Sequence, residues 1–210
     1  DCIMEEVAIL HSLDHPNIVK YYETYNDQKY IYLVMEYVSG MPLFDKITQQ
    51  ANQTFTEAKA AKYMKALFQA INHCHAQNIV HRDIKPENIL ITGDTVKLAD
   101  FGSCRGIYSK PPFTEYISTR WYRPPECLLT DGYYNHKMDY WGIGCVFFEV
   151  LTLTPLFPGT NELDQVHKIH NILGTPQKEL LDQFQKVASH MEFDFPEKKG
   201  TGFQKMIPQY

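Results

Sequence analysis

A β-hairpin bounded by polar residues constrains the fold of this chain more than any other segment. Strand-like runs at 88–92 and 96–99 are joined by Gly93-Asp94, a pair of residues typical of a tight hairpin turn. Asn88 opens the first run and Asp100 directly follows the second. Because the turn folds the chain back on itself, these two side chains are predicted to lie at the same end of the hairpin.

The residue types around this hairpin suit the transfer of a phosphoryl group. Asp83 lies on the loop before it and is placed to accept the proton of an attacking hydroxyl, while Lys85 can steady a transferring phosphoryl group as a point charge. Asn88 and Asp100 offer the hard oxygen ligands that Mg²⁺ requires. Because a phosphoryl group is densely anionic, its transfer depends mainly on positioning and on neutralising charge. The pattern therefore predicts magnesium-dependent phosphoryl transfer.

The hydrophobic period divides the chain into a strand-rich first quarter and a helix-rich remainder. After an opening helical pattern, strand-like runs occupy 18–25 and 30–37, and residues 39–42 interrupt the pattern as a linker. From Thr56, a candidate helix N-cap, apolar residues recur every three or four positions. Residues 102–136 are rich in Pro, Ser, Thr, Tyr and Arg and are expected to form a long loop. Further helical patterns cover 138–151, 162–173 and 177–187. This order predicts two lobes with a hinge between them, an interface that ligands favour.

Composition narrows the class of protein. The formal net charge of −5 gives no sign of the basic face that nucleic-acid binders usually carry. The five cysteines are odd in number and no pair has C-x-x-C spacing, so neither a disulfide framework nor a zinc site is expected. The longest apolar run, 142–151, contains Glu149 and is shorter than the ~20 residues that span a bilayer. We expect a soluble, cytoplasmic protein, with the nucleus as the alternative location, and neither nucleic acid nor membrane as a partner.

Two motifs tie these residues to a known family. Residues 81–88 read His-Arg-Asp-Ile-Lys-Pro-Glu-Asn, and Asp100-Phe101-Gly102 follows one hairpin later. Over nearly its whole length the chain resembles the catalytic domain of eukaryotic serine/threonine protein kinases; the alternative is an unrelated fold that carries both motifs by chance. The resemblance implies an α+β, bilobal fold, with a partial small lobe at 1–38 and a mostly helical lobe at 39–210 that lacks its last helices. It also implies ATP and Mg²⁺ as cofactors.

The resemblance assigns the nucleotide-binding residues position by position. Glu6 matches the helix glutamate that pairs with the phosphate-binding lysine, although a solvated helix charge is the alternative. Met35 falls at the gatekeeper position. Glu36 and Val38 match the hinge residues whose backbone groups contact adenine, and Leu90 is expected to pack beneath the adenine ring.

Packing residues follow from the same resemblance. His81, Phe101, Leu10 and Tyr21 match the hydrophobic stack of an assembled kinase, so His81 is expected to pack and not to act as a base. Asp139 resembles the aspartate that anchors the backbone of the catalytic loop. A helix cap is the alternative role for Asp139, and the two roles are compatible.

The segment between Asp100 and Glu126 resembles a kinase activation segment. Its Thr114-Glu115-Tyr116 matches the Thr-x-Tyr pattern that an upstream activating kinase phosphorylates in mitogen-activated kinases. Each phosphate would add nearly two negative charges for arginines to bind. The alternative is an unmodified surface loop. The arginines expected to bind the phosphates are Arg120 and Arg123 for Tyr116, and Arg82 and Arg105 for Thr114.

Longer stretches of the sequence indicate which kinase subgroup the chain resembles. Residues 93–210 resemble the MOK/MAK-type kinases of the proline-directed, mitogen-activated-like branch, whereas residues 1–92 resemble calcium-dependent protein kinases. A join between two genes around 81–92 would explain this difference. There is no EF-hand loop, so calcium control has no support. By the same resemblance, Thr119 and Lys85 favour serine or threonine over tyrosine as the acceptor. The likeness to the proline-directed branch implies protein substrates with Ser/Thr-Pro sites.

The chain also departs from the family pattern. Neither a glycine-rich loop nor a Val-Ala-x-Lys strand precedes Glu6, and the arginine that normally pairs with Glu126 is not found. Pro42 replaces an acidic residue, Pro124 replaces alanine in Ala-Pro-Glu, and Gly142 replaces a serine in the buried helix. Two hypotheses remain: a serine/threonine kinase of which this is a piece, or a non-catalytic, pseudokinase-like binding module.

Overall fold

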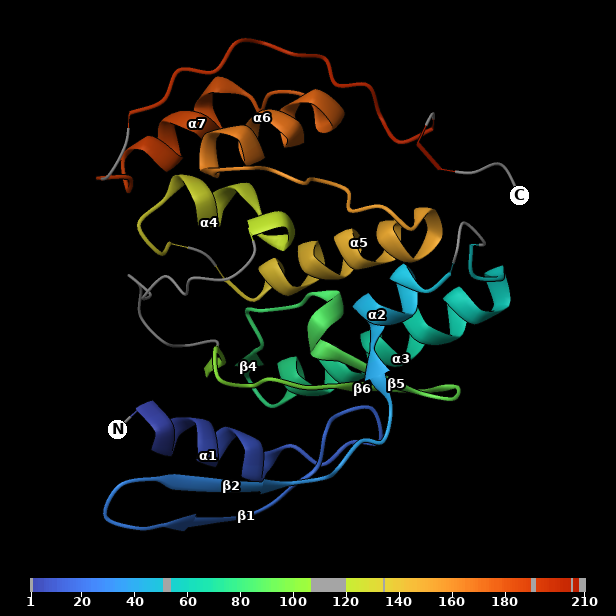
Figure 1. The fold of residues 1–210 in the computed structure, drawn as a ribbon. Helices are drawn as coiled ribbons and strands as arrows, with labels where there is room; N and C mark the ends of the chain where they lie inside the picture. Colours follow the sequence, from blue (N-terminus) through green and yellow to red (C-terminus); the bar gives the residue numbers. More distant parts are fainter. Residues whose placement is uncertain are drawn as a thin grey trace.

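The structure is a computed structural model that describes residues 2–50, 54–106, 120–133, 135–189, 192–204 and 206–207, with side chains from residue 7 onward. It has a small part that combines one helix with a β-hairpin, and a larger, mainly helical part (Figure 1). The small part consists of α1 (Cys2–Ser12), β1 (Tyr21–Asn26) and β2 (Ile31–Met35). The α+β, bilobal arrangement expected from the sequence is therefore confirmed, while the lobe boundaries at 1–38 and 39–210 stay a prediction.

The turn of the first hairpin has a local cause. The side chain of Asp27 accepts hydrogen bonds from the backbone N–H groups of Lys29 and Tyr30, both at 2.7 Å, and so mimics a backbone turn. These bonds lower the pKa of the Asp27 carboxyl. β1 and β2 pair antiparallel on either side of this turn.

The larger part follows a short connecting strand. β3 (Met41–Pro42) leaves the small part and pairs with β5 (Ile89–Thr92), which pairs with β6 (Thr95–Leu98). β4 (Ile79–Val80) pairs with β7 (Arg105–Gly106). The helices are α2 (Leu43–Thr48), α3 (Glu57–Ala76), α4 (Pro125–Leu129), α5 (Lys137–Thr152), α6 (Glu162–Leu173) and α7 (Lys178–Gln185), with single 3₁₀ turns η1 (Pro86–Asn88) and η2 (Arg120–Tyr122).

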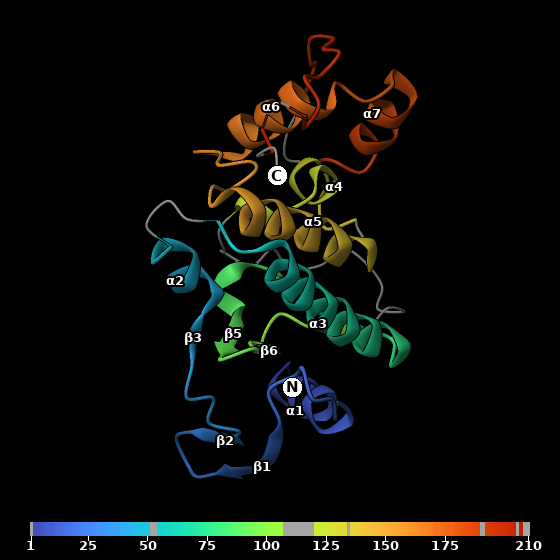
Figure 2. The ribbon, with the colours of Figure 1, turned by 90° about the vertical axis from the view of Figure 1, so that its right-hand side faces the viewer.

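α3 and α5 form the centre of the larger part, with the β5–β6 hairpin against α3 and with α6 and α7 beyond α5 (Figures 1 and 2). The predicted start of α3 is confirmed, because the Thr56 hydroxyl accepts the backbone N–H of Lys59. The apolar stripe of α3 is buried at Ala60, Tyr63, Met64, Leu67, Ala70, Ile71 and Cys74. Packing of this stripe, rather than helix propensity, stabilises a helix of this kind.

The central hairpin is confirmed and joins the two parts. Gly93 adopts a positive φ of 57° at the turn between β5 and β6, a conformation that glycine reaches without strain. On its outer side, Leu98 exchanges backbone hydrogen bonds with Asn17 and Val19, at 2.8 and 2.9 Å. The small part therefore binds directly to the strand that leads into Asp100.

Three expectations from periodicity were inaccurate. The long loop expected at 102–136 contains β7, η2 and α4, because buried Cys127, Leu128 and Leu129 stabilise a short helix that begins with proline. The strand expected at 18–25 begins three residues later. The segment 138–151 is apolar almost all round, which predicts a central buried helix; α5 is central, but Tyr140 and Phe147 are exposed on one of its faces.

Within the described residues, no helix combines the length and the apolar character needed to cross a membrane.

Two glycines of α5 provide a matched test of how closely this helix packs against the segment that contains Ile84. A Cβ at Gly142 would lie 2.8 Å from the Cβ of Ile84, whereas a Cβ at Gly144 would meet nothing within 4 Å. We predict that Gly144→Ala raises the free energy of unfolding by about 1 kcal/mol through helix propensity. Gly142→Ala is expected to lower it by about 1–3 kcal/mol through overpacking. Urea unfolding followed by circular dichroism measures both, and equal stabilisation by the two variants would contradict the close approach of α5 to the Ile84 segment.

Candidate active site

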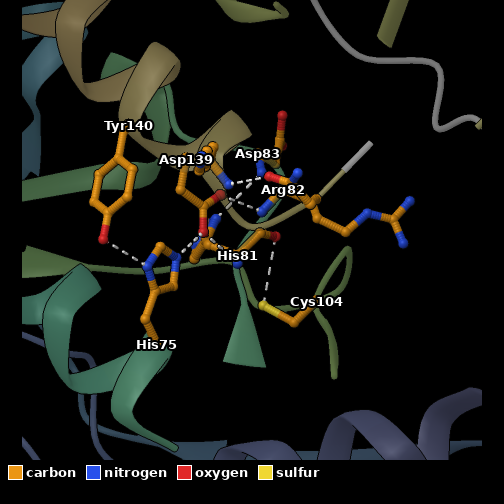
Figure 3. A network of polar contacts seen from close by, with 9 residues as sticks. His75, His81, Arg82, Asp83, Cys104, Asp139 and Tyr140 are labelled. Carbon is orange, nitrogen blue, oxygen red and sulfur yellow. Dashed lines mark hydrogen bonds and ion pairs between the residues drawn. The ribbon is translucent and has the colours of Figure 1, made fainter. Parts of the chain in front are cut away.

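The loop that carries Asp83 is anchored by a buried carboxylate on α5. The Asp139 side chain accepts the backbone N–H of His81 at 2.9 Å and that of Arg82 at 2.8 Å (Figure 3). Its side chain is fully buried. Asp139 therefore anchors the backbone of the catalytic loop, as expected. The cap role does not hold, because Asp139 lies inside the first turn of α5 and His136 is the N-cap.

A histidine that the sequence interpretation did not assign completes this anchor. His75, near the end of α3, contacts Asp139 Oδ2 through Nε2 at 2.8 Å and the hydroxyl of Tyr140 through Nδ1 at 3.2 Å (Figure 3). Asp139 thus joins α3, α5 and the loop. A third support comes from Cys104, whose thiol lies 3.5 Å from the carbonyl oxygen of His81.

His81 packs as the resemblance implied. It is completely buried, its ring meets Phe101 edge to face at 4.9 Å, and Leu10 belongs to the same core. Nε2 lies 3.1 Å from the carbonyl oxygen of Ala99, while Nδ1 accepts the backbone N–H of Asp83 at 3.3 Å. Burial lowers the pKa of His81, which favours a neutral ring that cannot serve as a general acid.

Two residues of the site have strained backbones. Arg82 and Asp100 have φ angles of 74° and 60°, in the left-handed region that non-glycine residues seldom adopt. Such a conformation costs on the order of 1–3 kcal/mol and persists only where the surroundings hold it. For Arg82 the surroundings include the hydrogen bond to Asp139.

The predicted catalytic residues of the loop converge on one oxygen atom. The ammonium of Lys85 lies 2.6 Å from Asp83 Oδ2, and the amide nitrogen of Asn88 donates to the same oxygen at 2.9 Å. The Asn88 nitrogen also donates to the backbone carbonyl of Asp83 at 2.8 Å. Since Asn88 uses its nitrogen for these bonds, its carbonyl oxygen Oδ1 is the atom suited to a metal ion.

Asp100 joins this group through the backbone. The backbone N–H of Ala99 donates to the carbonyl of Asn88 at 2.9 Å. Because Asp100 is the next residue, this bond fixes its backbone beside that of Asn88. Both aspartates flank the His81 ring along the backbone: Asp83 donates its N–H to one ring nitrogen, and the carbonyl of Ala99, the residue before Asp100, lies against the other. Asp100 is exposed and lines a cavity of about 110 Å³ with Leu10, Val19, Met35 and Phe101.

The residues predicted to hold adenine lie between the two parts. Met35, the expected gatekeeper, ends β2 and lines the cavity that Asp100 also lines. The backbone N–H of Glu36 donates to the carbonyl of Lys20 at 2.7 Å, which leaves the Glu36 carbonyl as the group that could contact adenine. Val38 is half-buried beyond it, and Leu90 is half-buried on β5, where it pairs with β3.

An ion pair that sequence reasoning missed fixes the Glu36 side chain. Its Oε2 accepts from the Lys97 ammonium at 2.8 Å and from the Lys20 backbone at 3.2 Å. Both partners lower the pKa of the Glu36 carboxyl. Because Lys97 belongs to β6, this pair ties the hinge to the hairpin that carries Asn88.

The regulatory residues are only partly within the described structure. Thr114, Tyr116 and Thr119, and the side chain of Glu6, lie outside the described residues. Arg105 donates to the carbonyl of Cys104 at 2.7 Å, and the Arg120 side chain lies 3.4 Å from Glu162. Arg82 is half-buried on the catalytic loop, and Arg123 follows η2. Their phosphate-binding role stays a prediction.

A buried glutamate next to this site also escaped sequence reasoning. Glu149 on α5 is 3% exposed and accepts a hydrogen bond from the Tyr122 hydroxyl at 2.7 Å. Burial, together with repulsion from Glu87, raises the pKa of Glu149 from 4.5 to about 7. Burial likewise raises the pKa of Glu126, to which no ion pair is found among the described residues.

Comparison with known proteins agrees with this geometry. A family model described as the protein kinase domain matches residues 1–203. The chain belongs to the protein kinase family. The kinase domain is 50% identical over 202 residues to the "MAPK/MAK/MRK overlapping kinase" of Homo sapiens. It is 42% identical over 204 residues to "Cyclin-dependent kinase F-4" of Oryza sativa subsp. japonica, and 39% identical over 206 residues to "Serine/threonine-protein kinase ICK" of Rattus norvegicus.

These alignments cover 95%, 97% and 98% of this chain but 48%, 44% and 32% of the relatives. The kinase domain described here therefore spans about half of the relatives' length, or less. An alignment over 95% of the chain runs through residues 81–92 and includes both sides of them. This alignment does not compare the two halves separately, so the join between two genes stays a hypothesis.

The anchor at Asp139 can be tested on stability. Asp139→Asn has a single acceptor oxygen for the three hydrogen bonds to His75, His81 and Arg82. We predict a loss of about 2–3 kcal/mol in the free energy of unfolding, because a buried N–H is left without its acceptor. Asp182→Asn, on the exposed surface of α7, removes a surface ion pair to Lys178 and is expected to cost less than about 1 kcal/mol. Similar losses for both variants in urea unfolding would contradict the anchor.

The Glu149 carboxyl predicts a pH dependence with a definite sign. Its pKa of about 7 in the folded protein exceeds the ordinary 4.5, so the folded state holds this proton more tightly than the unfolded state. The resulting stability is fully present below pH 4.5 and is lost as pH rises through about 7. Urea unfolding between those values compares wild type with Glu149→Gln, which cannot titrate. The free energy of unfolding of the wild type, minus that of Glu149→Gln, should fall as pH rises from 4.5 to 7. A constant difference over this range would refute the assignment.

Proposed function

We propose that the protein transfers the γ-phosphate of ATP to serine and threonine hydroxyls of protein substrates. The observation that carries this proposal is the convergence of Lys85 and Asn88 on one carboxylate oxygen of Asp83, on a loop held by a buried anchor. Family membership supports phosphoryl transfer, and two relatives are named as a cyclin-dependent kinase and a serine/threonine-protein kinase.

The residues present fit a magnesium nucleotide. Asn88 Oδ1 and the exposed carboxylate of Asp100 are hard oxygen donors, which is the donor set that Mg²⁺ selects. When bound, Mg²⁺ neutralises charge on the phosphates. Met35, Glu36, Val38 and Leu90 would border the adenine, as the family pattern implies.

The chain's own groups then divide the chemistry between them. Asp83 orients the substrate hydroxyl and accepts its proton. The hydroxyl oxygen forms a bond to the γ-phosphorus, while the bond between that phosphorus and the β–γ bridging oxygen breaks. ADP is the leaving group. Lys85 faces the same carboxylate oxygen and offsets negative charge on the transferring group. His81 stays neutral and holds the loop by packing against Phe101.

A substitution at Asp83 tests this division of roles in the whole protein. Asp83→Asn keeps the shape of the side chain but removes the proton acceptor. We predict a fall of about 10²- to 10⁴-fold in kcat for a Ser/Thr peptide, with a small change in the KM for ATP. Asp94→Asn, at the exposed turn of the β5–β6 hairpin, is the matched control and should leave both constants unchanged. Full turnover in Asp83→Asn would remove the proposed base, and a wild type that binds ATP without transferring phosphate would instead favour the binding module.

We further propose that the kinase is proline-directed and is activated by phosphorylation of Thr114 and Tyr116 by an upstream kinase. The Thr-x-Tyr sequence and the arginines at 120 and 123 support this, together with a cyclin-dependent kinase among the relatives. The cytoplasm remains the expected location.

Replacing Tyr116 tests the regulatory proposal. Tyr116→Phe cannot carry a phosphate, and we predict that it lowers the activity of a preparation treated with an activating kinase by about tenfold or more, because the two added charges are lost. Tyr133→Phe, an exposed tyrosine outside the segment, is the control. Unchanged turnover in the Tyr116 variant would remove this switch from the account.

A further inference from the structure

Two histidines meet where the small part of the structure contacts the larger part. His15 lies in the loop between α1 and β1, and His73 lies near the end of α3. Their ring centroids are 5.1 Å apart, and the rings are tilted by 35°. Nε2 of His73 is buried and has no hydrogen-bond partner among the described residues. The two rings therefore form a contact across the junction of the two parts, and the proposed phosphoryl transfer does not use it.

The hydrogen bond that His15 makes requires a neutral ring. Its Nδ1 accepts the backbone N–H of Asn17 at 3.0 Å, so Nδ1 carries no proton and the single ring proton is on Nε2. A second proton would go to Nδ1, where it would point at the N–H of Asn17. Protonation of His15 therefore removes the acceptor of the Asn17 N–H.

Asn17 binds the small part to β6 through both its backbone and its side chain. Its carbonyl accepts the N–H of Leu98 at 2.8 Å, and its side-chain amide donates to the carbonyl of Val96 at 2.9 Å. Both bonds depend on the position of the Asn17 backbone, which the bond to His15 helps to fix. The protonation state of His15 is therefore coupled to the contact between the two parts.

The charges on the elements packed around His15 also oppose its protonation. Burial lowers the pKa of His15, and positive charge on His73 of α3 and on Lys97 of β6 lowers it further. Lys97 forms an ion pair with Glu36 at 2.8 Å, and this pair lowers the pKa of the Glu36 carboxyl. Lys97 and Glu36 therefore both stay ionised in the range where a histidine titrates.

No ion pair between a carboxylate and either of these two rings is found within the part of the chain that the structure describes. Asp14, directly before His15, has a side chain that is 82% exposed and lies 3.6 Å from the ammonium of Lys20. His75, two residues after His73, shows the contrast, because its Nε2 lies 2.8 Å from the buried carboxylate of Asp139. A protonated His15 would meet cations without such a partner.

We propose that His15 is a pH-sensitive latch between the two parts: as pH falls, protonation of its ring releases Asn17 and weakens the docking of the small part on β6. Because the docked state binds the second proton less tightly than a free histidine does, docking is at full strength above about pH 6.5 and weakens below it. Met35 and Glu36 of the small part border the proposed nucleotide site, so nucleotide binding should weaken as well. This last consequence alone rests on the proposed function.

Hydrogen exchange in the whole protein tests the latch. The N–H of Leu98, which is bound to the Asn17 carbonyl, reports docking, and its protection relative to the intrinsic exchange rate is compared at about pH 7.5 and about pH 5.5. His15→Asn keeps an acceptor oxygen near the position of Nδ1 and cannot titrate. We expect protection of Leu98 to fall about five- to tenfold at the lower pH in wild type, the effect of one lost hydrogen bond. In His15→Asn it should change by less than about twofold.

Two controls separate the latch from a general loss of stability. The N–H of Leu67, inside α3, should keep its protection at both pH values. His167→Asn, at an exposed position on α6, should behave as wild type. An equal fall at Leu98 in wild type and in His15→Asn would overturn the latch, and so would a fall at Leu67 as large as that at Leu98.

Calorimetry with MgADP at the same two pH values tests the consequence for the nucleotide. The Kd should rise about twofold or more beyond the rise in His15→Asn, which corrects for titration of the nucleotide itself. An equal rise in both proteins would overturn the coupling of the latch to the nucleotide site. If wild type binds no MgADP at either pH, the proposed function fails, and exchange at Leu98 still decides whether the latch exists.

Discussion

The buried carboxylate of Asp139 is the interaction on which the site depends. Removing a carboxylate from water costs free energy. For Asp139 this cost is offset by hydrogen bonds from two backbone N–H groups of the catalytic loop and by contact with the ring of His75. The same bonds hold Arg82 in a left-handed conformation that it would not keep alone. As a result α3, α5 and the loop form one unit, and the position of Asp83 follows from packing in the core of the larger part.

Carboxylates and cations alternate around this unit. Asp83 and Glu87 share the loop with Arg82 and Lys85, and Lys85 forms an ion pair with Asp83 at 2.6 Å. The buried Glu149 has a pKa raised to about 7, in part by repulsion from Glu87. A nucleotide is strongly anionic, so bound Mg²⁺ would supply the positive charge that offsets repulsion between its phosphates and the carboxylates of Asp83 and Asp100.

Local features of the sequence predicted most of the framework. The β5–β6 hairpin, the cap at Thr56 and the anchoring role of Asp139 each have a short-range signal: a turn dipeptide, a hydroxyl before an apolar stripe, or a family motif. The contacts that escaped prediction join residues distant in the chain. The sequence carries no periodic signal for these contacts, because a polar side chain considered alone is expected at the surface. They are His75 with Asp139, Tyr122 with Glu149, and Gln165 with Trp121. α4 was missed because its surroundings are rich in proline and polar residues, and burial of its leucines stabilises it.

The most direct test of the central claim is whether one magnesium nucleotide binds to the site formed by Asn88 and Asp100. Thermal unfolding of the whole protein would be followed with ATP alone, with Mg²⁺ alone and with both, in wild type and in Asp100→Asn. A ligand at about 100 times its Kd stabilises the folded state by about 2.7 kcal/mol, which is a clear rise in Tm. The account predicts this rise for wild type only when Mg²⁺ and ATP are both present, and its loss in Asp100→Asn. No shift at millimolar MgATP, or an equal shift in both proteins, would contradict it.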